Sequence, residues 1–292
     1  MRIVELDYLS IGPEPLGATL YLPEGSGPLV GLVEVHGGAW VHGDRLGNAF
    51  LDRSLAERGI AVLAIDFRVP PAVRYPEPIA DINYALRWMK ANGPRWGIPP
   101  ERVGVLGTSS GGHQSLLATL RPFDPRYLAH EAPRAWDADI DATVCCTVVC
   151  WGVTDPVARL AMAREQGIER LVEAHALYWP DEAAMGEGSP QAILERKEEV
   201  RLSPTLVIQG TKDDNLTPDM ADRFAAAYRA AGGVVTLEKF EGQPHMFITS
   251  DPTGAASQEA IGIIAEFALR HGSTGRAGRG LTKPPEMEEE RP

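Results

Sequence analysis

The sequence predicts an α/β fold, in which an open and mostly parallel sheet is covered by helices on both faces. Short β-branched apolar runs alternate with longer amphipathic stretches along most of the 292 residues. That alternation is typical of strand–helix–strand units joined by right-handed crossovers. The runs near Val62, Val103, Val144 and Leu206 are nearly continuous in apolar residues, which is typical of parallel strands buried on both faces.

The individual elements follow from these runs and from the turn residues between them. Six strands are predicted, at residues 29–35, 60–67, 103–106, 143–151, 205–209 and 234–240. Five helices are predicted, at residues 48–58, 79–91, 110–120, 218–231 and 257–270. The fourth helix ends at Gly232-Gly233, a common helix stop. The first twenty-odd residues are compatible with an added antiparallel hairpin, although they contain Pro13 and Pro15.

One domain is predicted over residues 1–271, with two segments that depart from the alternation. Residues 156–200 hold helix-forming sequence without a strand and are interrupted by Gly and Pro at 186–190. We expect this helical insertion to form a cap or lid. Residues 272–292 are mostly Gly, Pro and charged residues with little to bury, so a disordered tail is expected there.

Composition excludes several classes of function. The chain has 28 Lys and Arg against 40 Asp and Glu, a net charge of −12, so it lacks the basic field that nucleic-acid binding needs. No signal peptide is visible, and the apolar runs fall short of the roughly 20 residues that span a bilayer. Cys145, Cys146 and Cys150 cluster in one apolar run, as expected for reduced, buried thiols. We therefore expect a cytoplasmic protein without membrane or nucleic-acid partners.

A nucleophile is indicated at residues 107–111, which read GTSSG. This G-x-S-x-G segment follows a predicted strand and opens a predicted helix, the context in which a sharp turn exposes the serine hydroxyl. The small residues at positions 107 and 111 let the strand and the helix approach each other closely. The helix N-terminus favours negative charge as it develops. Ser109 is therefore the candidate nucleophile.

An oxyanion loop is indicated by the segment HGGAW at residues 36–40, directly after the first buried strand. Its two glycines let backbone N–H groups turn inward, and a tetrahedral acyl intermediate requires such donors. We assign the donors to the amides of Gly38, Ala39 and Ser110, and expect His36 to hold the loop by hydrogen bonding. Trp40, and Trp151 at the end of a predicted strand, are the candidate pocket residues. Glu34 is an unusual carboxylate inside an apolar strand, either a paired structural acid or a support for this loop.

A base and an acid are indicated on two later loops. His245 alone among the seven histidines lies between the last predicted strand and the last helix. Asp213 and Asp214 follow the strand at 205–209, and either could orient the imidazole of His245. The chain order of nucleophile, acid and base is the order expected on an open α/β sheet of this kind. The three loops leave the carboxyl ends of strands and converge on one crevice.

Four segments together resemble a known group of enzymes. HGGAW, GTSSGG, GTKDDNLTP and GQPHMF are similar to motifs of the α/β-hydrolase superfamily, in particular of the hormone-sensitive-lipase and feruloyl-esterase-like esterases. The resemblance covers residues 15–271 and implies an α/β-hydrolase fold with a triad of Ser109, Asp213 and His245. Asp213 is favoured over Asp214 and Asp155 because the family's G-x-x-D-x-x-V/L loop matches Gly210 to Leu216. One departure is that the lipase group usually carries HGGG, whereas Ala39 and Trp40 follow HGG here.

The sequence therefore predicts a serine esterase that needs no cofactor and no metal and acts on small-molecule esters through an acyl-enzyme. No dinucleotide-binding, P-loop or metal-ligand spacing is present. The HGG-x-W loop also resembles arylformamidases, so a small-amide hydrolase is an alternative. A catalytically silent ligand-binding protein of the same fold is an alternative of another class. A homo-oligomer is left open.

Overall fold

A single sheet positions the site. The computed structural model describes residues 1–11, 14–25, 27–137 and 139–273, and within them the sheet has eight strands in the order β1-β2-β4-β3-β5-β6-β7-β8. The strands are β1 (Arg2–Ile11), β2 (Glu14–Leu22), β3 (Val30–Val35), β4 (Ile60–Ile65), β5 (Val103–Thr108), β6 (Thr147–Cys150), β7 (Thr205–Gly210) and β8 (Val235–Phe240). β3 to β8 are parallel, whereas β1 and β2 pair in antiparallel fashion with each other and β2 with β4.

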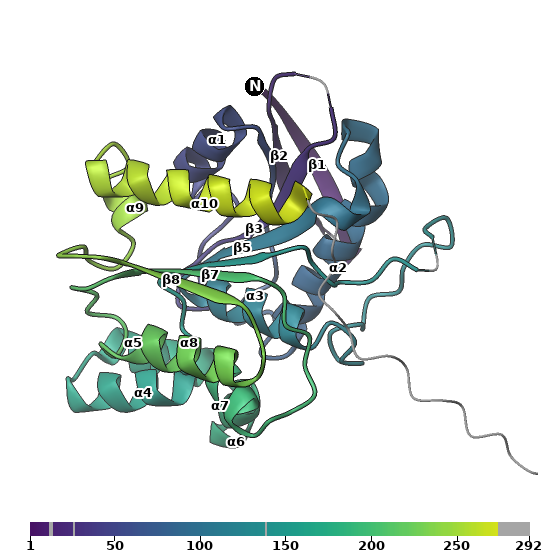
Figure 1. The fold of residues 1–292 in the computed structure, drawn as a ribbon. Coiled ribbons are helices and arrows are strands. Elements are labelled where there is room, and N and C mark those ends of the chain that lie inside the picture. Colours follow the sequence, from purple (N-terminus) through teal and green to yellow (C-terminus); the bar gives the residue numbers. More distant parts are fainter. Residues whose placement is uncertain (12–13, 26, 138, 274–292) are drawn as a thin grey trace, which may run out of the picture.

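Helices cover the two faces of this sheet. They are α1 (Ala49–Glu57), α2 (Glu77–Asn92), α3 (Ser110–Leu120), α4 (Pro156–Glu165), α5 (Glu169–Tyr178), α6 (Glu182–Glu187), α7 (Pro190–Glu195), α8 (Met220–Ala230), α9 (Phe247–Ser250) and α10 (Ala255–Ser273), with short 3-10 turns at Gly93–Trp96 and Pro100–Arg102. Figure 1 shows α1 and α10 on one face, and α3, α8 and the helices α4 to α7 on the other. The α/β prediction is confirmed.

Burial explains why the central strands are so apolar. Every residue of β3, β4, β5, β6 and β7 is buried, because helices pack on both faces of these strands. β8, nearer the edge, has exposed positions. Since β3, β5, β7 and β8 run in parallel, the loops that follow them leave the same edge of the sheet.

Two sequence expectations can be compared with the strands in detail. The strand expected at 143–151 forms ladder pairs only over Thr147–Cys150. On the β7 side the ladder begins at Thr205, because Pro204 has no N–H to donate. The N-terminal hairpin is confirmed as β1 and β2. Pro15 is accommodated because it lies outside the Ala18–Tyr21 stretch of β2 that pairs with β4, and Pro13 lies outside the described residues.

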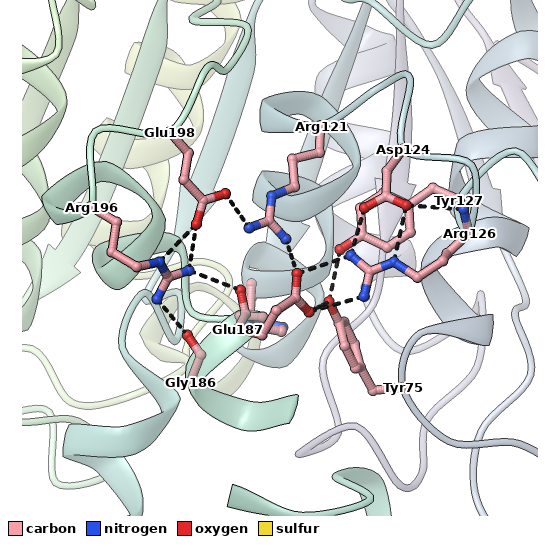
Figure 2. A network of polar contacts seen from close by, with 11 residues as sticks. Tyr75, Arg121, Asp124, Arg126, Tyr127, Gly186, Glu187, Arg196 and Glu198 are labelled. Atoms are coloured by element: carbon pink, nitrogen blue, oxygen red, sulfur yellow. Dashed lines mark hydrogen bonds and ion pairs between the residues drawn. The ribbon is translucent and has the colours of Figure 1, made fainter. Parts of the chain in front are cut away.

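The insertion at 156–200 contains α4, α5, α6 and α7. Figure 2 shows how α6 is fastened to the main body: Glu187 accepts hydrogen bonds from Arg121, from Arg126 and, at 2.6 Å, from the hydroxyl of Tyr75. Whether the insertion acts as a cap stays a prediction. α10 continues through Ser273, and the remainder of the tail predicted at 272–292 lies outside the described residues.

Two further expectations concern membranes and thiols. In the part of the chain that the structure describes, no helix is long and apolar enough to cross a membrane. Cys145, Cys146 and Cys150 are free thiols, and all three are buried. The expectation of unpaired, buried cysteines is therefore confirmed.

Candidate active site

The turn at Ser109 joins β5 to α3 in a strained conformation. Ser109 has φ +52° and ψ −118°, a region that L residues rarely occupy. Its N–H donates to the carbonyl of Cys150 on β6 at 2.9 Å. A Cβ on Gly111 would lie 2.1 Å from the carbonyl oxygen of Val35, so only glycine lets α3 start this close to β3. The turn therefore holds the Ser109 side chain at the carboxyl edge of the sheet.

Three side chains form one continuous chain of hydrogen bonds. Ser109 Oγ lies 2.9 Å from His245 Nε2, and His245 Nδ1 lies 2.8 Å from Asp213 Oδ2. Because an ionised carboxylate only accepts, Nδ1–H donates to Asp213 and Nε2 is left to accept from the Ser109 hydroxyl. The His245 and Asp213 side chains are 9% and 3% exposed. Loops after β5, β7 and β8 thus bring together the three residues predicted as the triad.

Asp213 accepts hydrogen bonds from two further donors besides His245. Gln209 Nε2 donates to its Oδ2 at 2.8 Å, and the backbone N–H of Asn215 donates to its Oδ1 at 2.9 Å. Burial alone would raise the pKa of Asp213, but the hydrogen bond and the charge of His245, together with these donors, hold the pKa below its usual range. Asp213 is therefore ionised at neutral pH and can orient the imidazole.

The two competing aspartates have other partners. Asp214 Oδ1 accepts from the side-chain amide of Asn215 at 3.0 Å. Asp155 accepts from the N–H of Ala158 as the N-cap of α4, and it pairs with Arg223 at 3.2 Å. Neither carboxylate is bonded to His245 in the described structure. The geometry thus singles out Asp213 among the three.

The loop after β3 has the backbone expected of an oxyanion loop. Gly38, Ala39 and Trp40 have successive φ values of +122°, +51° and +69°. A Cβ on Gly38 would lie 1.8 Å from the carbonyl oxygen of His42, and one on Gly37 would lie 3.2 Å from Ser109 Cβ, so the loop packs directly against the nucleophile turn. Among the described residues, no acceptor is bonded to the N–H groups of Gly38, Ala39 or Ser110. These are the three amides predicted as oxyanion donors.

The two candidate pocket residues are both packed into the protein. Trp40 is 1% exposed and its Nε1–H donates to His113 Nδ1 at 3.1 Å, while its ring stacks on Tyr178. Trp151 is also 1% exposed and lies edge-on to His245, with 6.3 Å between ring centroids. Trp151 thus contacts the candidate base, and a pocket role for either tryptophan stays a prediction.

Two other histidines near the site bond to residues outside the candidate triad. His36 Nδ1–H donates to the carbonyl of Gly37 at 2.7 Å, and its ring stacks on Phe67, as expected for a residue that holds the loop. His113 is bonded to Trp40 and lies 2.8 Å from the carbonyl of Gly188. Burial lowers the pKa of His113 to about 3, so it is neutral and packed.

An open groove lies away from the candidate triad, and a small cavity borders one of its members. The groove has a volume of about 1720 Å³ and lies at the far ends of α3 and α8, and its lining includes Phe123, Leu202 and Val234. A small cavity of about 60 Å³ lies beside Asp213 and is also lined by Gln209 and Lys239. The hydrogen bonds of Ser109 define the candidate site, because a groove alone carries no chemistry. No group of three or more metal-ligating side chains occurs among the described residues.

Sequence reasoning missed three polar residues around the site. Gln209 is a polar residue at the carboxyl end of an apolar strand, which is a visible signal for a second residue on Asp213. Asn48 Nδ2 donates to Thr108 Oγ1 at 3.0 Å, directly beside the nucleophile. Arg159 of α4 lies over the Trp40 ring and donates to the carbonyl of Asn215 at 3.1 Å. Neither Asn48 nor Arg159 stands in a recognisable motif.

The known sequences that resemble this chain include proteins named as esterases. The sequence model of the BD-FAE family matches residues 19–228. Esterase LipC of Mycobacterium tuberculosis is 36% identical over 242 residues, which are 81% of this chain and 57% of LipC. The probable carboxylic ester hydrolase LipM of the same organism is 31% identical over 221 residues, 74% of this chain and 46% of LipM. The chain thus spans about half the length of these curated relatives.

Comparison with solved structures identifies the fold. A thermophilic esterase from the planctomycete Thermogutta terrifontis, solved with propionate bound, superposes with a TM-score of 0.71 at 23% identity, covering 95% of this chain and 96% of that one. The same enzyme has been solved phosphorylated by paraoxon, with a TM-score of 0.71 at 22% identity, covering 92% of this chain and 94% of that one. The fold is therefore that of the α/β-hydrolase esterases.

Proposed function

The chain belongs to the BD-FAE family, and from that membership we propose that it is a serine hydrolase that cleaves carboxylic esters of small molecules. The observation that carries the proposal is the unbroken hydrogen-bond chain from Ser109 through His245 to Asp213. The relatives LipC and LipM, named as an esterase and a probable carboxylic ester hydrolase, support the ester substrate class.

In the proposed mechanism, His245 Nε2 accepts the proton of Ser109 as the hydroxyl oxygen attacks the ester carbonyl carbon. Asp213 keeps the proton on Nδ1 and stabilises the imidazolium that forms. The amides of Gly38, Ala39 and Ser110 bind the oxyanion, and a single donor of this kind is worth about 3–4 kcal/mol. His245 then protonates the departing alcohol, and a water molecule that loses its proton to His245 releases the acyl group from Ser109.

Labelling with a fluorophosphonate tests the proposal directly. The phosphonyl group should attach once per chain, peptide mapping should place it on Ser109, and labelling should abolish turnover of a p-nitrophenyl ester. A protein that is neither labelled nor active on any ester would overturn the proposal. It would favour a ligand-binding protein of the same fold.

A substrate panel separates ester hydrolysis from the related alternative. An aryl formamide hydrolase is the second candidate, because the HGG-x-W loop that ends at Trp40 also resembles that of arylformamidases. The panel compares p-nitrophenyl esters of short acids, aryl formamides and feruloyl esters on the same pure protein. Short acyl chains of about two to six carbons should be cleaved fastest if the insertion and Trp40 restrict the crevice. Fastest turnover of a twelve-carbon ester would contradict the restriction.

A further inference from the structure

A buried polar cluster lies beneath the nucleophile turn, and Asn48 is at its centre. Asn48 Nδ2 donates to Glu34 Oε1 at 2.8 Å and to Thr108 Oγ1 at 3.0 Å. Its Oδ1 accepts from the hydroxyl of Thr249 at 3.2 Å. An amide group has two N–H donors and one carbonyl, so this one side chain bonds three elements at once.

These three elements each carry part of the candidate catalytic machinery. Glu34 is on β3, two residues before the oxyanion loop, and Thr108 directly precedes Ser109. Thr249 is on α9, which begins two residues after His245. Met246, with φ +58°, is the single residue between His245 and α9. Asn48 thus links by hydrogen bonds the segments that carry the candidate nucleophile, the candidate oxyanion loop and the candidate base.

The carboxyl group of Glu34 has no ion-pair partner in the part of the chain that the structure describes. Glu34 and Asp52 are both 0% exposed. Glu34 Oε2 and both Asp52 carboxyl oxygens have no hydrogen-bond partner among the described residues. Burial raises the pKa of Glu34 to about 8, against the opposing hydrogen bond from Asn48. Burial and the charge of Glu34 raise the pKa of Asp52, and Arg53 lowers it. Glu34 therefore keeps its proton at neutral pH.

The other titratable groups that act on this pair lie on neighbouring strands. Cys150 of β6 has its pKa raised by burial and by the charge of Glu34. Tyr21 of β2 has its pKa raised by burial and by the charges of Asp52 and Glu34, against Arg53. An ionised Glu34 would thus lie near the carboxyl group of Asp52, the thiol of Cys150 and the phenol of Tyr21. Arg53 is the cation that acts on Asp52 and Tyr21. An uncompensated buried charge of this kind is strongly destabilising.

We propose that Glu34 is a positioning residue for the reaction, which in its neutral form keeps Asn48 in the orientation that ties the Ser109 turn to the helix behind His245. The inference rests on the proposed hydrolase function. When Glu34 ionises, the buried negative charge disturbs this arrangement and also lies near the loop that must receive the oxyanion. Turnover should then fall as the pH rises through about 8.

The test compares kcat and KM from pH 6 to 10 for the wild type, E34Q and D52N on one p-nitrophenyl ester. E34Q carries a neutral isostere of the protonated acid, so it should lose less than tenfold in kcat at pH 7. It should also lack the alkaline decline, so that its kcat at pH 9 stays near its own value at pH 7, whereas the wild type should lose roughly tenfold between these two pH values. D52N removes the neighbouring acid and is the matched control, which should keep a decline. An alkaline decline that persists unchanged in E34Q overturns the inference, whatever D52N does.

Variants of the central amide give a second test that does not depend on E34Q folding. N48L should lower kcat by roughly a hundredfold with KM changed less than threefold, because orientation rather than substrate binding is lost. T249V removes only the bond to α9 and should have a smaller effect in the same direction. The fluorophosphonate labelling rate of the wild type, followed across pH, should decline above about pH 8. A labelling rate that keeps rising to pH 10 overturns the inference, whereas failure of labelling at every pH overturns the proposed function instead.

Discussion

Two adjacent serines at the turn have different surroundings. Ser109 Oγ is bonded to His245, whereas Ser110 Oγ is buried and has no hydrogen-bond partner among the described residues. Ser109→Ala should therefore lower kcat by roughly 10⁴-fold or more and shift Tm by less than about 2 °C. Ser110→Ala should be mild, because the backbone amide remains. Mapping of the fluorophosphonate adduct to Ser110 would contradict this assignment.

The strain at Ser109 allows a matched control on stability. Glycine adopts φ +52° without the steric cost that an L side chain carries. Ser109→Gly should therefore be as inactive as Ser109→Ala and more stable by about 1 kcal/mol, a difference measured by urea unfolding of the two variants side by side. Equal stability of the two would mean that the turn stores no strain.

Isosteric substitutions can distinguish the contribution of Asp213 to kcat from those of Asp214 and Asp155. Asp213→Asn should lower kcat by at least a hundredfold with the fold intact, since loss of the orienting carboxylate costs about 10⁴ in related triads. Asp214→Asn and Asp155→Asn should keep most activity, because their carboxylates bond to Asn215 and to the N-terminus of α4 instead. If either control is the inactive variant and Asp213→Asn is not, the assignment is wrong.

Among single residues, the sequence predicts those whose chemical role requires a short motif. Ser109, Gly38 and Asp213 stand in short patterns because a turn or an amide donor needs fixed spacing along the chain. Asn48 could not be predicted, because it bonds to Glu34, Thr108 and Thr249, and the last of these is 201 residues away. Contacts of that kind are set by how the elements pack, which no local pattern records.

At the scale of helices and strands, the attachment of the insertion to the main body depends on the carboxylate of Glu187, which accepts hydrogen bonds from two arginines. Glu187 bonds to Arg121, Arg126 and Tyr75 (Figure 2) and joins α6 to the segment after α3. Glu187→Gln should lower the free energy of unfolding by about 1 kcal/mol, because these bonds are half-exposed. Tm should fall by roughly 2–4 °C. Glu182→Gln is the matched control on the same helix, since its partner Arg164 is 58% exposed, and it should leave Tm unchanged.

The predicted elements agree with the structure where burial imposes the pattern. β3, β4, β5 and β7 are buried along their whole length, so their apolar runs mark them within a few residues. The strand expected at 143–151 is shorter because its length depends on the partner strand, where Pro204 delays the ladder. The internal arrangement of α4 to α7 was beyond prediction, because it is fixed by side-chain contacts such as those of Glu187.

At the scale of the whole molecule, the wholly and partly buried carboxyl groups are of two opposed kinds. Burial would raise the pKa of Glu187, but Arg126, Tyr75 and Arg121 hold it at about 2. Asp213 is also held below its usual range. Glu34 and Asp52, buried without a direct ion pair among the described residues, have raised values instead. The first kind favours folding when ionised, and the second favours folding when protonated.

Stability should therefore decline on both sides of a mildly acidic optimum. A Glu ordinarily titrates near ~4.3, so the contribution of Glu187 is present above that pH and is lost as the pH falls through about 2. The contribution of Glu34 is present below its unfolded-state pKa and is lost as the pH rises through about 8, because the unfolded chain releases that proton earlier. Urea unfolding at pH 3, 5, 7 and 9 should show E34Q gaining stability over the wild type with rising pH, and E187Q differing least from it at pH 3. If the difference between E34Q and the wild type is the same at pH 5 and pH 9, Glu34 does not titrate in this range and the alkaline loss has another origin.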